Sequence, residues 1–476
     1  MSRRGWWVTA VVCAGCTQEV VVTPVIDLPV DDPEAAPFAT LDEITLAVAH
    51  AGEERDRTIA RFTRGETFEL GGVPFGDDLV IHMTGFDELS PSAYGRTCTF
   101  ALDADGPSAQ PHLFFSRSLR FASTGIESIA RIGGRAVSLD GAAILIGGTV
   151  RNNPVLDIER FDPLTGELST VGVVTERVGA VDALLGTSSA RVIIVGGRIG
   201  AQGAGFVETI DPEDEGNPVN KVENTKVARV GLTATTLTDG RVIGVGGNPP
   251  GLPPVGTITQ ISAQGADVDI VDLRTELAHP RTAHTATRLG DDIGAPVLIA
   301  GGVDATGSPV AVAELFKPLT DELARPATFA PQMVVPRSGH AAVRMPDGSV
   351  LFIGGVDAAD NEVRTLEQFT REGDFVVVGE LPDNAAVLDS TVTTLPDGRI
   401  LIAGGRKPGG PPTDTAFIAV LREDGSIDVV QTLDRLAAPR AGHQATLLCD
   451  GTVLISGGTE GAAPMERYNP PVAGRR

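Results

Sequence analysis

One short phrase recurs seven times in this chain: an apolar run that ends in two adjacent glycines. Successive copies lie 49, 50, 55, 53, 50 and 53 residues apart. The glycine pairs are Gly147-Gly148, Gly196-Gly197, Gly246-Gly247, Gly301-Gly302, Gly354-Gly355, Gly404-Gly405 and Gly457-Gly458. A nearly fixed period of about 50 residues is typical of a repeat architecture. The repeat therefore limits the fold more than any other feature of the sequence does.

Each apolar run predicts a β-strand that is buried on both faces. In Val350-Leu351-Phe352-Ile353, for example, all four consecutive residues are apolar. A strand with one solvent-exposed face would alternate apolar and polar residues, so this pattern indicates a strand packed between two layers. Glycines directly after such a strand suit a backbone with positive φ or one that passes close to another segment. A phosphate-binding loop is the functional alternative, but neither a Lys-Ser/Thr pair nor a third spaced glycine follows the glycines. We therefore interpret the glycines as structural.

Other elements recur in register with the glycines. An Asp-Gly dipeptide, as in Pro346-Asp347-Gly348, precedes several of the apolar runs and predicts a tight turn. A Glu followed by an apolar or aromatic residue comes 8 to 12 residues after most pairs, as in Glu367-Gln368-Phe369, and a further alternating segment follows it. Four strands per period, repeated seven times, predict a seven-bladed β-propeller.

The unit resembles the kelch repeat of the galactose-oxidase and kelch propeller family, over roughly residues 119 to 470. The matching motifs are the Gly-Gly pair, an Arg-x-x-His before the preceding strand and a Glu-x-Phe-Asp-Pro after it. The usual repeat also carries a Tyr and a Trp, whose packing role we assign here to Phe161, Phe316 and Phe369. We expect an all-β chain whose main part, residues 118–470, is a seven-bladed kelch-type β-propeller.

The segments before the propeller predict export and a second small domain. Residues 1–16 combine a basic start with a short apolar core and end in Ala14-Gly15-Cys16, which resembles a bacterial lipobox and implies lipidation of Cys16. An ordinary cleaved signal peptide is the alternative. Residues 17–39 read as a flexible tether, and residues 40–117 as a small β-sandwich-like domain. Residues 471–476 form a C-terminal tail.

Closure of the propeller is expected to join the two ends of the repeat region. The seventh repeat stops near Tyr468, too close to the C-terminus for a fourth strand. Leu119-Arg120-Phe121-Ala122 is placed to supply that strand, since an open ring would leave strand edges unpaired. We predict that residues 118–124 pair with the strand around Glu466 to Tyr468.

The composition disfavours two classes of partner, and the cysteine count allows one disulfide. The formal net charge of −24 disfavours binding of nucleic acid or anionic lipid through a basic surface. Outside the signal region the cysteines are Cys98 and Cys449, one in each predicted domain. They could pair in an oxidising compartment, although the sequence alone does not determine this.

Three histidines occupy one repeat position and are a possible metal site: His284, His340 and His443. They belong to different blades, and zinc ligands must converge to about 2.0–2.1 Å from the ion. We expect instead that each imidazole hydrogen-bonds to backbone in its own blade. The acidic cluster Asp357, Asp360 and Glu362 lacks the ordered spacing of a calcium loop. We predict no metal and no cofactor.

Five arginines recur where the chain enters the innermost predicted strand: Arg177, Arg229, Arg281, Arg337 and Arg440. The kelch resemblance implies a position near the channel mouth, where such arginines help to hold acidic partner peptides. Guanidinium groups bind carboxylates bidentately, so these five are candidate binding residues. The structural alternative is that each arginine pairs with a repeated Glu such as Glu314 or Glu367.

Two classes of function remain. We favour an envelope-anchored lipoprotein, at the outer membrane or cell surface, that binds a protein, peptide or other ligand through the loops after the Gly-Gly pairs, because binding usually resides in variable loops on a fixed scaffold. It would be a monomer that contacts membrane only through its lipid; a freely secreted protein is the alternative. The second class is a periplasmic or surface enzyme, epimerase- or lyase-like, that works in the propeller channel. Copper-radical chemistry is disfavoured because the chain has only Tyr94 and Tyr468, and we assign no catalytic residue.

Overall fold

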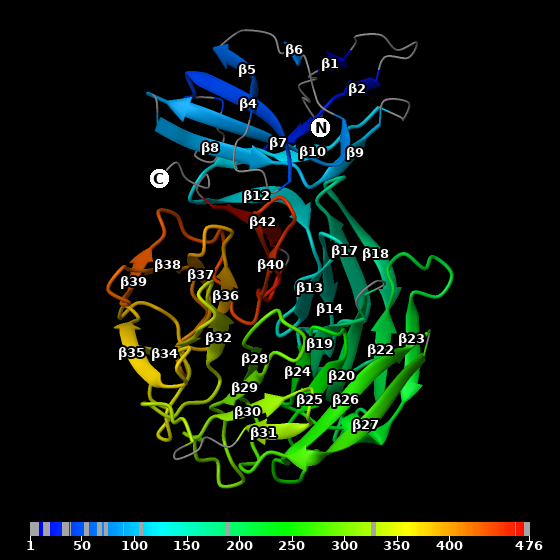
Figure 1. The fold of residues 1–476 in the computed structure, drawn as a ribbon, viewed down its shortest axis with the longest axis vertical. Coiled ribbons are helices and arrows are strands. Elements are labelled where there is room, and N and C mark those ends of the chain that lie inside the picture. Colours follow the sequence, from blue (N-terminus) through cyan, green and yellow to red (C-terminus); the bar gives the residue numbers. More distant parts are fainter. Residues whose placement is uncertain are drawn as a thin grey trace.

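The computed structural model describes residues 9–12, 20–30, 38, 40–51, 57–63, 69–70, 75–88, 90–103, 108–186, 190–265, 267–324, 330–461 and 463–470. Cys16 and the tail 471–476 lie outside this range, as does most of the expected signal peptide. In the described residues the chain is built of small antiparallel sheets, with one 3-10 turn, η2 (Thr225–Val227). This architecture is consistent with a β-propeller (Figure 1).

Seven sheets of at least four strands follow one another from Arg120 to Asn469. We number them 1 to 7 and give each from its innermost strand outwards. Sheet 1 contains β13 (Arg135–Leu139), β14 (Ala142–Ile146), β17 (Asp157–Asp162) and β18 (Glu167–Val173). Sheet 2 contains β19 (Val178–Leu185), β20 (Arg191–Ile199), β22 (Phe206–Ile210) and β23 (Val219–Glu223), with β21 (Gln202–Gly203) paired to β20. Sheet 3 contains β24 (Thr233–Thr236), β25 (Val242–Val245), β26 (Thr257–Gln264) and β27 (Asp267–Glu276).

The remaining four sheets repeat this order. Sheet 4 contains β28 (Thr285–Arg288), β29 (Val297–Ala300), β30 (Glu314–Lys317) and β31 (Glu322–Ala324). Sheet 5 contains β32 (Ala341–Arg344), β33 (Val350–Ile353), β34 (Thr365–Phe369) and β35 (Phe375–Glu380). Sheet 6 contains β36 (Thr391–Thr394), β37 (Ile400–Ala403), β38 (Ala416–Leu421) and β39 (Ile427–Gln431). Sheet 7 contains β40 (Gln444–Leu447), β41 (Val453–Ser456), β42 (Pro464–Asn469) and β12 (Arg120–Glu127).

The innermost strands contact one another in a closed cycle: β13, β19, β24, β28, β32, β36, β40 and back to β13. The apolar runs of the sequence form the second strand of each sheet, and every residue of β37 is buried. Its two faces pack in different directions, because Ile400 and Ile402 join a core with sheet 5 while Leu401 and Ala403 join one with sheet 7. Burial on both faces therefore explains the unbroken apolar pattern.

Sheet 7 is completed by the strand that precedes sheet 1. Strand β12 pairs antiparallel with β42, in the register Phe121 with Tyr468 and Ser123 with Glu466. The rings of Phe121 and Tyr468 pack with centroids 5.0 Å apart. The predicted pairing of residues 118–124 with the strand around Glu466 to Tyr468 is thus confirmed.

A separate sheet precedes the repeats and lies beside β12 and β42 (Figure 1). Its strands, in order, are β11 (Ser116–Arg117), β8 (Ser90–Arg96), β7 (Gly76–Asp87), β4 (Glu43–His50) and β5 (Arg57–Thr63), with β9 (Phe100–Leu102) also paired to β7. Smaller pairings join β3 (Val25–Asp27) to β10 (His112–Phe114), and β1 (Thr9–Val12) to β2 (Val20–Val22) and β6 (Glu69–Leu70). This part has its own core, which includes Leu46, Ile81 and Phe115.

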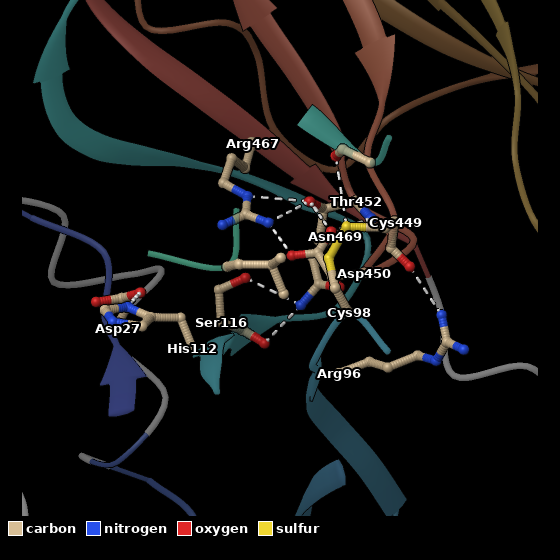
Figure 2. A network of polar contacts seen from close by, with 12 residues as sticks. Asp27, Arg96, Cys98, His112, Ser116, Cys449, Asp450, Thr452, Arg467 and Asn469 are labelled. Carbon is tan, nitrogen blue, oxygen red and sulfur yellow. Dashed lines mark hydrogen bonds and ion pairs between the residues drawn. A yellow bond between two sulfur atoms is a disulfide. The ribbon is translucent and has the colours of Figure 1, made fainter. Parts of the chain in front are cut away.

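The junction between this N-terminal sheet and sheet 7 is polar, buried and covalent (Figure 2). Cys98 and Cys449 form a disulfide with a Cα–Cα distance of 5.1 Å, within the usual range. Asn469, which is fully buried, donates through Nδ2 to the carbonyl oxygens of Tyr94 at 2.6 Å and Ser116 at 3.0 Å. The disulfide that the sequence left open therefore joins the two parts of the chain.

Loss of this disulfide should destabilise the protein. It closes a loop of 351 residues, and removal of a native disulfide typically costs about 2–5 kcal/mol. We expect Cys98→Ala/Cys449→Ala to melt at a lower temperature than the wild type, as followed by circular dichroism, and added reductant to lower only the wild-type midpoint. Peptide mapping without reduction should recover Cys98 linked to Cys449. Equal melting of wild type and double variant would contradict the prediction.

Candidate functional site

The Gly-Gly pair follows directly after the second strand in six sheets and lies within β20 in sheet 2, and both glycines of every pair have positive φ, between 55° and 96°. At Gly301, a Cβ atom would lie 2.3 Å from Cε1 of His340 and 2.7 Å from the carbonyl oxygen of Arg337. Both neighbours belong to the segment that leads into the next sheet. Positive φ and close approach to another segment are the two conditions under which only glycine fits.

The second glycine of a pair links its sheet to the next one. Its N–H donates to the carbonyl oxygen of the residue that precedes the next innermost strand by a few positions. These bonds are Gly197 to Arg229, Gly247 to Arg281, Gly302 to Arg337, Gly355 to Val387, Gly405 to Arg440 and Gly458 to Arg131, all between 2.7 and 2.9 Å. The same backbone contact therefore recurs between neighbouring sheets and includes the junction of sheets 7 and 1.

The side chain of the same arginine turns back into its own sheet. Its guanidinium donates to the carbonyl oxygen of the first glycine and to a glutamate on the third strand. The ion pairs are Arg131–Glu159 (2.5 Å), Arg177–Glu208, Arg281–Glu314 (2.8 Å), Arg337–Glu367 and Arg440–Glu466 (2.9 Å). In sheet 3, Arg229 donates instead to Oγ1 of Thr259 at 2.7 Å, and this hydroxyl donates to Asp272.

The glutamates complete the network by accepting backbone N–H groups. Glu367 accepts from Val334 at 2.7 Å and from Val335 at 3.0 Å, and Glu314 accepts from Ala278 at 2.7 Å. These donors lie in the segment between two sheets, where no strand partner satisfies them. Each carboxylate thus serves both a buried cation and buried amides, as a buried charge requires.

The five candidate binding arginines are Arg177, Arg229, Arg281, Arg337 and Arg440, and none is more than 6% exposed. As binding residues they would form a ring of guanidinium groups at the channel mouth that could hold a partner's carboxylates. Instead these groups are buried and bonded to glutamate or threonine and to glycine carbonyl oxygens. The geometry therefore disfavours the binding role and favours the structural alternative, including the named partners Glu314 and Glu367.

Burial also acts on the charges of this network. Loss of hydration lowers the pKa of the Arg281 and Arg337 guanidinium groups, against the attraction of Glu314 and Glu367. For Arg229 burial lowers the pKa to about 10, and only Asp272 opposes it. With a pKa of about 10, Arg229 is charged at neutral pH.

The sequence analysis missed Arg131, which makes the same contacts in sheet 1. It lies 16 residues before Gly147, whereas the other five precede their glycines by 17 to 20. This spacing could have identified it. Sheet 6 has neither member of the pair: Val387 takes the arginine position and Phe417 the glutamate position.

The three histidines bridge neighbouring sheets. Nε2 of His284, His340 and His443 lies 3.2, 3.0 and 2.8 Å from Oγ1 of Thr233, Thr285 and Thr391 respectively, each in the preceding sheet. The expected bond to backbone of the same blade was wrong, because the imidazole points across the junction to a side chain. Burial, and to a smaller extent the nearby arginine, lowers the pKa of each to about 3.

The loops after the glycine pairs begin and end at fixed points. In six sheets the second glycine carbonyl accepts an N–H from the far side of the loop: Gly148 from Val155, Gly197 from Ala204, Gly247 from Val255, Gly302 from Val310, Gly355 from Val363 and Gly405 from Thr413. Between these points the loops vary in sequence, although those of sheets 4 and 5 both begin with Val-Asp-Ala, and they carry exposed side chains such as Arg151, Leu252 and Asp360. We call these six loops the loop face.

Within the described residues no cluster of three or more His, Cys, Asp or Glu is arranged to hold a metal ion. Asp357 instead accepts backbone N–H groups from Ala359 and Asn361 in its own loop. The described part of the chain also has no helix of the length and apolarity needed to cross a membrane.

Comparison with known proteins gives only a weak structural likeness to the solved structure described below. No family model matches the chain, and no curated protein matches it. Among solved structures, one described as "Structure of YjhT" is similar, with 12% sequence identity and a TM-score of 0.46 over 61% of this chain and 94% of that chain.

The Arg337–Glu367 pair should behave as a coupled unit, and sheet 6 supplies the matched replacement. Arg337→Val alone leaves a buried carboxylate without its cation, which should cost about 3–5 kcal/mol of unfolding free energy. The double variant Arg337→Val/Glu367→Phe copies Val387 and Phe417 of sheet 6 and should recover at least half of that loss. Denaturant unfolding of the wild type, both single variants and the double variant measures the coupling. A double variant as unstable as the sum of the two single ones would contradict it.

The buried histidines should make stability depend on pH below 6.5. Their pKa is about 3 in the folded state and 6.5 in the unfolded chain, so unfolding takes up protons and stability falls as pH drops through this window. Each should cost about 2 kcal/mol at pH 5 relative to pH 8. His284→Leu, which copies Leu232 of sheet 3, should remove about a third of this contribution in denaturant unfolding between pH 5 and 8. Thr233→Val breaks the same contact but keeps the imidazole, so it should leave the slope unchanged; equal slopes in both variants would refute the assignment.

Proposed function

We propose that residues 118–470 form a seven-bladed kelch-type β-propeller that follows a small β-sandwich-like domain and binds a protein, peptide or other ligand through the loop face. The observation that carries this proposal is the repeated closure of the six loops at their glycine carbonyls. Loops of variable sequence, held at both ends on one scaffold, are the usual setting for binding.

The network beneath the loop face supports this role. Five of the six loops begin at a glycine pair whose first carbonyl oxygen accepts from a buried arginine, as in Arg337 to Gly354 at 3.2 Å. In sheets 2 to 7 the N–H of the second glycine is bonded to the next sheet. The loop ends therefore move little relative to one another. Such a preorganised surface loses little conformational entropy when it binds a partner.

A kelch-type enzyme with a site in the channel is the alternative, and Asp182 favours it. This residue lies in β19, an innermost strand, and burial raises the pKa of its carboxyl. Nε of Arg135 lies 3.9 Å away. The cavity beside them measures only about 30 Å³, roughly the volume of one water molecule. We therefore keep the interaction module as the primary proposal.

We further propose that the protein is a monomeric lipoprotein of the cell envelope, attached through Cys16. Sequence supports this, since Ala14-Gly15-Cys16 follows a short apolar core. The acidic chain would then meet the membrane only through its lipid, and the propeller would be presented above it.

The test combines cell fractionation with site-specific photo-cross-linking in the native host. Wild type should be found in the membrane fraction with a lipid-sized mass increase, and Cys16→Ala should be soluble. A photo-reactive phenylalanine analogue at Leu252, 61% exposed on the loop face, should cross-link to a discrete partner. The same analogue at Val377, 51% exposed on the outer strand β35, is the matched control and should not. Equal cross-linking at both positions, or none at Leu252, would reject the loop face.

A further inference from the structure

A second surface lies between sheets 2 and 3, at the end of the strands opposite the loop face. It is an open cavity of about 780 Å³, which we call the intersheet groove. Sheet 2 contributes Thr209, Asp211 and Asp214, and sheet 3 contributes Arg241, Ser262 and Asp267. The volume lies within the range of about 300–1,000 Å³ typical of ligand sites.

Thr209 is the feature that the fold does not explain. It is 2% exposed, and its Oγ1 has no hydrogen-bond partner within the described structure. Because strand residues alternate between faces, Thr209 shares the face of Val207, which packs in a core with Ile261 of sheet 3. Its side chain therefore lies on the side of the sheet that faces the groove, which it lines. A buried hydroxyl without a partner costs free energy, which a ligand that supplies a donor would recover.

The charges around the hydroxyl define the ligand. Four aspartates and two arginines line the groove, an excess of two negative charges: Asp211, Asp214, Asp239, Asp267, Arg191 and Arg241. Both arginines are already engaged within the protein. Arg241 pairs with Asp239 at 2.8 Å and donates to the Pro318 carbonyl oxygen at 3.2 Å, and Arg191 donates across the groove to the Gly265 carbonyl oxygen at 2.8 Å.

The remaining carboxylates are oriented by their own turns. Oδ1 of Asp214 accepts N–H groups from Gly216 and Asn217, each at 3.0 Å. Oδ1 of Asp211 accepts from Glu213 at 3.1 Å. Asp267 begins β27 on the opposite wall and is exposed. Acceptors therefore lie on both walls of the groove, with the unpartnered hydroxyl beneath them.

We propose that the intersheet groove binds a basic peptide segment, with an arginine or lysine side chain directed at Thr209. A guanidinium or ammonium group carries only donors, so it matches an acceptor-rich site with excess negative charge. The whole-chain charge of −24 would accelerate association with such a ligand. The groove is separate from the loop face, and neither proposal depends on the other.

The test measures binding of a labelled peptide of three Gly-Arg repeats by fluorescence anisotropy, with the Gly-Gln counterpart as the uncharged probe and spermidine as competitor. Wild type should bind the arginine peptide and not the glutamine peptide. Asp214→Asn/Asp267→Asn keeps the turn-forming acceptor of Asp214 but removes two charges, and should weaken binding about tenfold or more. Asp374→Asn/Asp424→Asn removes two charges from exposed turns of sheets 5 and 6 and should change it less than about twofold.

The variant Thr209→Val distinguishes specific binding in the groove from general electrostatic attraction of the peptide to an acidic protein. It leaves the charge unchanged, should weaken binding about tenfold and should not lower the melting temperature, because the lost hydroxyl has no partner in the free protein. Competition by spermidine at equal charge concentration would identify a free polyamine as the ligand and reject the peptide. Equal weakening in both aspartate double variants, unchanged binding in Thr209→Val, or no binding by wild type would each overturn the proposal.

Discussion

A single residue position connects the repeats of this protein. At Arg281 and Arg337, for example, the backbone carbonyl accepts the N–H of a glycine from the preceding sheet, while the guanidinium binds a glycine carbonyl and a glutamate within its own sheet. The backbone bond sets the spacing between sheets, and the side chain holds the loop-bearing end of its sheet. Both contacts require the arginine segment to lie so close to the glycine pair that a Cβ atom would clash, so only glycine fits there. The repeated Gly-Gly pair and the repeated arginine are therefore one structural unit.

Sheets 3 and 6 show which part of this unit is essential. Sheet 6 keeps the backbone bond from Gly355 to Val387 but has no ion pair, because Val387 and Phe417 replace the arginine and glutamate together. Sheet 3 keeps its arginine and replaces the glutamate with Thr259, backed by Asp272. No sheet retains a buried glutamate without its cation. This agrees with the principle that a buried pair can be exchanged for apolar residues, but one charge cannot be left alone.

Much of the fold could be predicted because it follows from local pattern. The period, the buried second strands and the pairing of Phe121 with Tyr468 all follow from apolar runs, turn dipeptides and the need to leave no strand edge open. The partners of buried polar groups could not be predicted in the same way. His284 bonds Thr233, 51 residues away in another sheet, and Cys98 bonds Cys449 across 351 residues. Such pairs depend on how sheets are placed relative to one another, which repeat spacing alone does not specify.

The polar groups at the two ends of the strands differ in how many of them have hydrogen-bond partners. This difference distinguishes residues that hold the fold together from residues that are free to bind a ligand. Beneath the loop face, the repeated charges of the sequence are buried within the network, so the arginines that the sequence offered as a binding site are at most 6% exposed. At the opposite end, no repeated glycine pair links sheets 2 and 3, and Thr209 keeps a buried hydroxyl without a partner beside oriented carboxylates. A repeat motif therefore marks residues that maintain the fold. Residues available for binding are better sought where the repeats diverge: in the parts of the loops that vary in sequence, and in the groove between sheets 2 and 3.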